Sequence, residues 1–136
     1  MKWIIILDFI LHPFLCYCQY HTPKCADLKE CIVYSRSQDK HQPYKILITR
    51  STLKQVNLTT GDSSVWEIHW VEECGFTIKY LAGNDSLNQG QKYYLQDHAI
   101  ALKIESITPD YYLYTAYRDR IGRRPYAQDT LWIHEH

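Results

Sequence analysis

Cysteine has the clearest chemistry in this sequence, because two thiols form a disulfide in an oxidising compartment and thiolates bind metal ions. The chain contains five cysteines among its 136 residues. Cys16 and Cys18 lie in an N-terminal segment that we expect to be removed, which leaves Cys25, Cys31 and Cys74. An odd number of thiols leaves one unpaired or paired between chains. The residues alone leave the pairing of these cysteines open.

Metal binding and catalysis are the other chemistries that reactive side chains offer. No C-x-x-C or H-x-x-x-H spacing occurs, and the terminal pair His134 and His136 is a weak chelator. Glu72 and Glu73 fall at a predicted hairpin tip, where paired carboxylates are usually solvated. The sequence has no G-x-S-x-G elbow and no Gly-rich phosphate loop. We therefore predict a non-enzymatic protein with no catalytic residue, no metal site and no cofactor.

Residues 1–18 have the layout of a secretory signal peptide. Lys2 precedes an apolar run from Trp3 to Leu15, and Cys16 and Cys18 supply small residues before a cleavage site near Cys18/Gln19. The run is too short and too interrupted to span a bilayer. We predict export to the periplasm or the exterior and a single mature domain of residues 19–136. Two alternatives stay open: a lipid anchor at Cys16 or Cys18, and a first strand or anchor helix.

Composition and charge exclude several classes of partner. The formal net charge is zero, from 15 basic and 15 acidic residues, whereas a nucleic-acid partner requires a basic patch. No basic amphipathic helix is present for a membrane surface. The apolar fraction of 46% and the charged fraction of 22% are those of a globular protein. The aromatic fraction of 14% favours strands, where rings pack on pleated surfaces.

The residues 65–81 form the clearest element, a predicted hairpin whose arms alternate between apolar and polar side chains. A corner containing Cys74 and Gly75 separates the two arms. The inner wall predicted from this alternation comprises Trp66, Ile68 and Trp70 on the first arm and Phe76, Ile78 and Tyr80 on the second.

Further short strands are predicted at 31–35, 44–50, 53–58, 92–95, 99–107, 111–117 and 130–133. The intervening polar loops include 36–43, 82–91 and 118–126, and we expect 82–91 to be the most mobile. About seven to nine strands without a convincing amphipathic helix predict an all-β antiparallel meander, which closes into a lipocalin-like barrel or forms a strongly bent sheet. An immunoglobulin-like sandwich fits less well, because Trp66 and Trp70 directly precede the later cysteine.

A set of motifs resembles small, uncharacterised secreted proteins of Bacteroidetes-type bacteria. The shared features are a cysteine followed by Leu28-Lys29, an Ile-x-Arg strand ending at Arg50, and a Trp-x-x-x-Cys-x-aromatic corner from Trp70 to Phe76. The resemblance implies export and a β-rich fold, with no known activity. Together with the corner position of Cys74 it favours a Cys25–Cys74 disulfide, which would stabilise the fold by about 4 kcal/mol. Cys31 departs from the pattern and is predicted to be free or an alternative partner.

Two functions of different classes follow from the aromatic and basic residues. In the first, a cell-envelope interaction module contacts a protein or glycan through a basic hairpin, since Arg and Tyr are enriched at interfaces. In the second, the barrel carries a small lipophilic ligand, with aromatic residues lining the cavity or filling the core. The candidate contact residues are Arg118, Arg120, Arg123, Arg124 and Tyr126. The candidate lining residues are the inner wall of the hairpin together with Tyr93, Tyr112, Tyr114 and Trp132.

Overall fold

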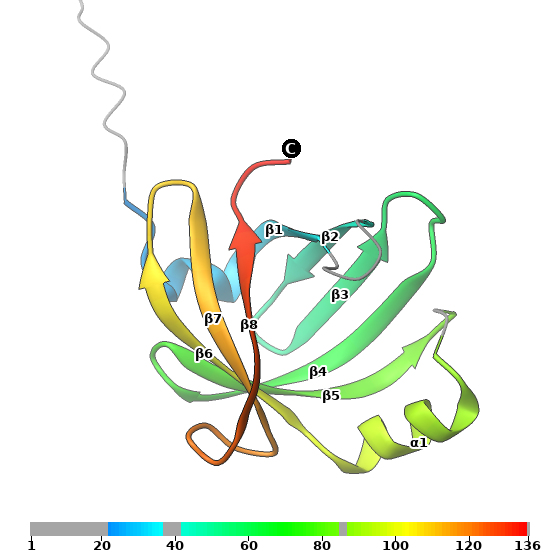
Figure 1. Ribbon diagram of the computed structural model, residues 1–136. Coiled ribbons are helices and arrows are strands. Elements are labelled where there is room, and N and C mark those ends of the chain that lie inside the picture. The colour runs from blue at the N-terminus through cyan, green and yellow to red at the C-terminus, as the bar shows by residue number, and fades with distance from the viewer. Residues whose placement is uncertain (1–21, 37–41, 85–86, 136) are drawn as a thin grey trace, which may run out of the picture.

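The structure is a computed structural model that describes residues 22–36, 42–84 and 87–135. Eight antiparallel strands form a closed barrel in sequence order, which confirms the predicted all-β meander (Figure 1). The elements are η1 (Cys25–Glu30), β1 (Cys31–Arg36), β2 (Pro43–Ile48), β3 (Thr52–Asn57), β4 (Ser63–Glu72), β5 (Gly75–Gly83), α1 (Gln89–Asp97), β6 (Ile100–Ile107), β7 (Tyr111–Arg118) and β8 (Pro125–Trp132).

Several predictions concern residues outside the described ranges. The signal peptide at 1–18, its cleavage site, a lipid anchor at Cys16 or Cys18 and most of the loop 36–43 fall there. Within the described ranges, no helix is long and apolar enough to cross a membrane.

The predicted hairpin at 65–81 corresponds to β4 and β5. Trp66 pairs with Tyr80, Ile68 with Ile78 and Trp70 with Phe76 across the two strands. The alternating residues of both strands face the interior, as expected for a sheet with one buried face. Five of these six side chains are buried, and Trp70 is half-buried.

The strand predicted at 92–95 is wrong, because these residues belong to α1. The Asn88 side chain accepts a hydrogen bond from the Gln91 backbone N–H at 2.9 Å, and the Gln91 side chain accepts one from the Asn88 N–H at 3.0 Å. This reciprocal capping box stabilises a helix start despite the strand-like Tyr93 and Tyr94. The predicted loop 82–91 is correspondingly shorter, since β5 extends to Gly83.

The last strand is longer than predicted. β8 begins at Pro125, so the loop 118–126 is shorter than expected. The first residues of β8 are exposed and therefore lack the apolar alternation that marks a strand. Their strand conformation follows from pairing with β7, where Gln128 lies opposite Thr115 and Ala127 opposite Ala116.

One end of the barrel is closed by η1, which lies at the left in Figure 1. Leu28 of η1 is fully buried, with 0% of its surface exposed. A Cys25–Cys74 disulfide joins η1 to the β4–β5 corner across 49 residues of sequence, as the resemblance predicts. We call this region the closed end.

The opposite end has less regular strand pairing. β5 pairs with β6 only from Gly75 to Ile78, because β6 begins at Ile100. α1 lies beside the remainder of β5, where Lys92 Nζ donates a hydrogen bond to the Gly83 carbonyl at 3.2 Å. A second irregularity lies at the seam of the barrel and not at this end: within the described residues, β1 pairs with β8 through a single rung, Tyr34 with Trp132. We call the end beside α1 the open end.

Candidate functional site at the open end of the barrel

The inward side chains of β2, β3 and β4 change from apolar to polar toward the open end. Strand register identifies them, because cross-strand partners point to the same face. The interior is therefore apolar where η1 closes it and polar where α1 adjoins it. From closed to open end the inward residues are Ile48, Ile46 and Tyr44 on β2, Leu53, Gln55 and Asn57 on β3, and Ile68, Trp66 and Ser64 on β4.

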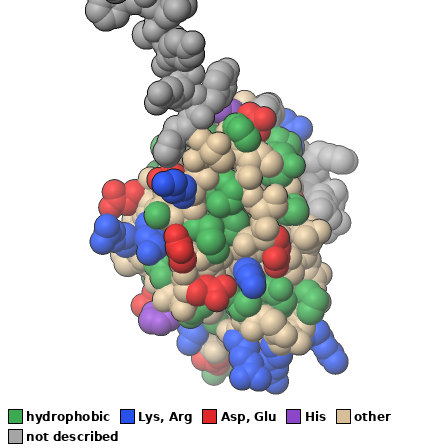
Figure 2. Space-filling model, turned by 90° about the vertical axis from the view of Figure 1, so that its left-hand side faces the viewer, with side chains coloured by type: hydrophobic (Ala, Val, Ile, Leu, Met, Phe, Trp, Pro, Cys, Tyr) green, Lys and Arg blue, Asp and Glu red, His purple; other side chains and the backbone are tan. Residues whose placement is uncertain are grey.

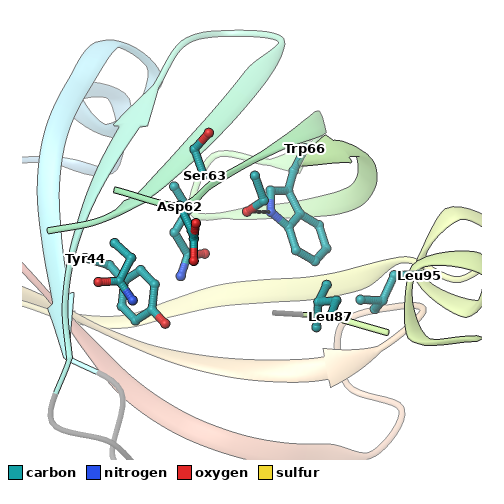
Figure 3. A pocket seen from close by; sticks show the side chains of 9 residues that line it. Tyr44, Asp62, Ser63, Trp66, Leu87 and Leu95 are labelled. Atoms are coloured by element: carbon teal, nitrogen blue, oxygen red, sulfur yellow. Dashed lines mark hydrogen bonds between the residues drawn. The ribbon is translucent and has the colours of Figure 1, made fainter. Parts of the chain in front are cut away.

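A hollow of about 190 Å³ lies at this polar part of the interior and is called the mouth pocket (Figure 3). Tyr44 and Asp62 lie on one side of it, and Leu87 and Leu95 lie on the other. The lining residues are Tyr44, Gln55, Asn57, Asp62, Ser63, Ser64, Trp66, Leu87 and Leu95.

Three of the lining residues, Asn57, Ser64 and Trp66, have side chains engaged in structural hydrogen bonds. Asn57 Nδ2 donates to Gln42 Oε1 at 2.7 Å, while Asn57 Oδ1 accepts from the backbone N–H groups of Thr59 at 2.9 Å and Thr60 at 3.1 Å. Asn57 therefore shapes the β3–β4 turn. Trp66 Nε1 donates to Ser64 Oγ at 2.9 Å, which fixes the indole plane in the pocket wall.

Three polar side chains of the mouth pocket are available to a ligand. Within the described residues, the Tyr44 hydroxyl, the Gln55 amide and the Asp62 carboxylate have no side-chain hydrogen bond or ion pair. They adjoin the Trp66 indole and two leucines, so the pocket offers both hydrogen bonding and apolar contact. The negative charge of Asp62 disfavours an anionic ligand here.

The strand β5 approaches the pocket wall closely. A Cβ at Gly83 would lie 2.5 Å from the Ser63 carbonyl oxygen, so a side chain at this position would collide with β4. The Ser63 N–H donates to Asn84 Oδ1 at 2.8 Å, and the Asn84 N–H donates to the Ser63 carbonyl at 3.0 Å. This junction holds the rim of the pocket in place.

Most of the residues predicted to line a cavity or to fill the core belong to the core. Among them only Trp66 lines the mouth pocket. Trp70 lies toward the closed end, where its ring centroid is 4.7 Å from that of Phe76 and 5.2 Å from Lys29 Nζ. Tyr93 of α1 is 72% exposed and contributes to neither region. The core members among them are Trp66, Ile68, Phe76, Ile78, Tyr80 and Tyr112.

Three aromatic residues of β7 and β8, Tyr112, Tyr114 and Trp132, have different surroundings. The Tyr112 hydroxyl donates to the Lys24 carbonyl at 3.4 Å near η1, and burial is the main cause that raises its pKa to about 12. Tyr114 pairs with Asp129 in the barrel wall, and burial, followed by the Asp129 charge, raises its pKa. Trp132 packs edge-on against Tyr111 with ring centroids 5.2 Å apart, on the face opposite the buried Leu131.

Cys31 is the free cysteine of the described chain. Its thiol donates to the Leu28 carbonyl at 3.4 Å. Burial, followed by the negative charge of Asp27, raises the thiol pKa to about 11, so the neutral form dominates at neutral pH. A nucleophilic cysteine requires the thiolate, which makes Cys31 a structural residue. In the described part of the chain, no group of three or more His, Cys, Asp or Glu side chains is placed to hold a metal ion.

The predicted contact residues of the basic hairpin gather beside α1. Arg118 and Tyr126 line one hollow of about 390 Å³. Arg118, Arg123 and Arg124 line an adjoining hollow of about 500 Å³. Arg120 lies in the same hairpin and lines neither hollow. The structure therefore brings four of these five residues together.

The polar residues of the mouth pocket were not predicted from sequence as site residues. Gln55 alternates with the buried Leu53 and Asn57, so a polar side chain occupies an inward position. A polar residue at a core position of a strand is an available signal for a site. Leu87 and Leu95 carry no such signal, since they reach the pocket only because α1 lies beside β5.

Comparisons with protein families, curated proteins and solved structures find no match for this chain. The resemblance to secreted Bacteroidetes-type proteins therefore stays a prediction.

Proposed function

We propose that this protein is an exported, non-enzymatic binding protein that takes a compact ligand into the open end of its barrel. The supporting observation is that inward strand positions at this end carry Tyr44 and Gln55, whose side-chain polar groups have no hydrogen-bond partner among the described residues. Polar groups converging on a partly apolar hollow are typical of small-molecule sites. The Cys25–Cys74 disulfide supports export, because disulfides persist in oxidising compartments.

The size and lining of the pocket limit the ligand. A volume of about 190 Å³ is below the ~300–1,000 Å³ of most drug-sized sites, so the ligand is about one ring in size. Trp66 offers a ring face, while Tyr44, Gln55 and Asp62 offer hydrogen bonds. The proposed ligand is an uncharged ring compound with hydroxyl substituents, which is more polar than the lipophilic ligand expected from sequence.

Titration of the purified protein with methyl pyranosides and with p-cresol tests this function. The indole N–H resonance of Trp66 should shift with saturation, while that of Trp132 should stay in place because Trp132 packs on Tyr111 outside the pocket. Gln55→Leu and Tyr44→Phe should each weaken binding by about 2- to 10-fold, the effect of one lost hydrogen bond. Gln128→Leu, at an exposed position of β8, is the matched control.

The proposal fails if neither class of probe moves the Trp66 resonance. It also fails if Gln55→Leu binds the probes as tightly as the unchanged protein while folding normally.

A further inference from the structure

A second hollow lies outside the mouth pocket, where the end of α1 and the start of β6 meet the β7–β8 hairpin. It consists of the adjoining hollows of about 390 Å³ and about 500 Å³, which share Tyr94, His98 and Arg118. We call it the arginine groove. Its apolar part is lined by Tyr94, Leu95, Ala99, Ile100 and Tyr126, and its charged part by His98, Arg118, Asp119, Arg123 and Arg124.

The charged part of the groove carries a net positive charge. Asp119 is the acidic lining residue, and its carboxylate lies 3.4 Å from His98 Nδ1 and 3.6 Å from Arg123 Nη1. In the described part of the chain, Arg118 and Arg124 have no carboxylate within ion-pair distance. Figure 2 shows basic side chains gathered at the lower edge of the molecule, where Figure 1 places the β7–β8 hairpin.

The apolar part of the groove has fixed walls. The rings of Tyr94 and His98 stack with centroids 4.3 Å apart, which gives the end of α1 a flat side. The Asp119 N–H donates to the Ala99 carbonyl at 2.9 Å, and Ile121 packs over Gly75, so the hairpin is attached at two points. Such preorganisation lowers the entropic cost of binding.

We propose that the arginine groove binds a small amphipathic anion, an acid with a short aliphatic or aromatic body. The apolar body lies between Leu95, Ile100 and Tyr126. The acidic group reaches Arg118 and Arg124, whose guanidinium groups bind oxyanions in a bidentate manner. The hollow of about 390 Å³ falls within the ~300–1,000 Å³ typical of small-molecule sites.

This ligand differs in charge from the one proposed for the mouth pocket. The mouth pocket contains the carboxylate of Asp62, and the groove contains the guanidinium groups of Arg118 and Arg124. Leu95 lines both hollows and separates them. Apart from Leu95, the two proposals rest on different residues, and the polar groups that test each one are not shared, so they fail independently.

Calorimetric titration of the purified protein with octanoate, octanol, octylammonium and acetate tests the groove. Octanoate should bind at one site, and octanol, octylammonium and acetate should each bind at least about 10-fold more weakly. Octanol and octylammonium lack the negative charge, and acetate lacks the apolar body. Raising the salt concentration should weaken octanoate binding, since exposed charges are screened.

Substitutions locate the binding. Arg118→Gln combined with Arg124→Gln should weaken octanoate binding at least about 10-fold, about the 1.4 kcal/mol expected of a lost charge-assisted contact. Arg120→Gln, in the same hairpin but outside the groove, should leave it unchanged. Octanol or acetate binding as tightly as octanoate, or a folded double variant with unchanged affinity, would overturn the proposal.

Discussion

The closed and open ends of this barrel are built by the same strands and differ in what fills them. At the closed end, Leu28 and Phe76 are fully buried, and the Cys25–Cys74 disulfide joins η1 to the β4–β5 corner. At the open end, β3 and β4 present Gln55 and Ser64 to a hollow. Apolar burial is the main favourable term in folding, so stability is concentrated at the closed end. We expect the open end to contribute less to stability, so its inward positions can carry binding groups.

Removing the disulfide should have the largest effect on stability. Cys25→Ser combined with Cys74→Ser releases a loop closed across 49 residues, and the chain-entropy model gives a loss of about 4 kcal/mol. Denaturant unfolding under non-reducing conditions measures this loss. Cys31→Ser, which removes a thiol outside the disulfide, should cost far less. Equal losses in the two variants would contradict the assignment of stability to this cross-link.

Two leucine truncations compare the ends directly. Leu28→Ala should cost about 2–5 kcal/mol, because Leu28 is 0% exposed and leaves a cavity under η1. Leu95→Ala should cost about 1 kcal/mol or less, since Leu95 is half-buried beside a hollow that already exists. Chemical denaturation of both variants measures the difference. Similar costs would show that the open end is as tightly packed as the closed end.

Gln55→Leu tests whether the polar lining serves binding instead of folding. Gln55 lies opposite Ile46 and makes no side-chain hydrogen bond among the described residues, so we expect a change in unfolding free energy within about 1 kcal/mol. Tm and denaturant midpoints check this. A loss of several kcal/mol would mean that the Gln55 amide has a structural role.

The last prediction concerns the Cys31 thiol, whose effect on stability appears only at high pH. Its pKa is raised from 9.0 to about 11 in the folded state, so folding favours the neutral thiol. The associated stability is complete below pH 9 and is lost as the pH rises toward 11. Iodoacetamide labelling of the native protein should therefore have a midpoint near pH 11, against about pH 9 for the unfolded chain. A midpoint near pH 9 for the native protein would show that the Cys31 thiol is exposed to solvent and that burial does not raise its pKa.

The strands with one apolar face were predictable from sequence, and elements without such a face were not. The alternation of Trp66, Ile68 and Trp70 predicts β4, and its register with β5 follows from the same residues. The exposed start of β8 has no alternation and is ordered by its pairing with β7. α1 depends on the capping box of Asn88 and Gln91, whereas its tyrosines favour a strand.

The candidate sites were less predictable than the fold. Arg118, Arg123 and Arg124 lie close together in sequence, so their proximity was expected. Their contact with His98 and Tyr94 depends on where α1 lies, which no local pattern specifies. The mouth pocket is the space left after side chains from three strands and α1 are packed. The volume of a pocket depends on residues far apart in sequence, so the hydrophobic periodicity of single strands does not predict it.

The single rung between Tyr34 and Trp132 has a consequence for the dynamics of the barrel. Every other neighbouring pair of strands shares four or more rungs. Among the described residues, closure of the barrel therefore depends on far fewer backbone hydrogen bonds than any other strand pairing. Local opening begins where the fewest bonds must break. Amide hydrogens along β1 and β8 at this seam should exchange before those of β4. The barrel should therefore open by separation of β1 from β8, while the other strand pairs stay hydrogen-bonded.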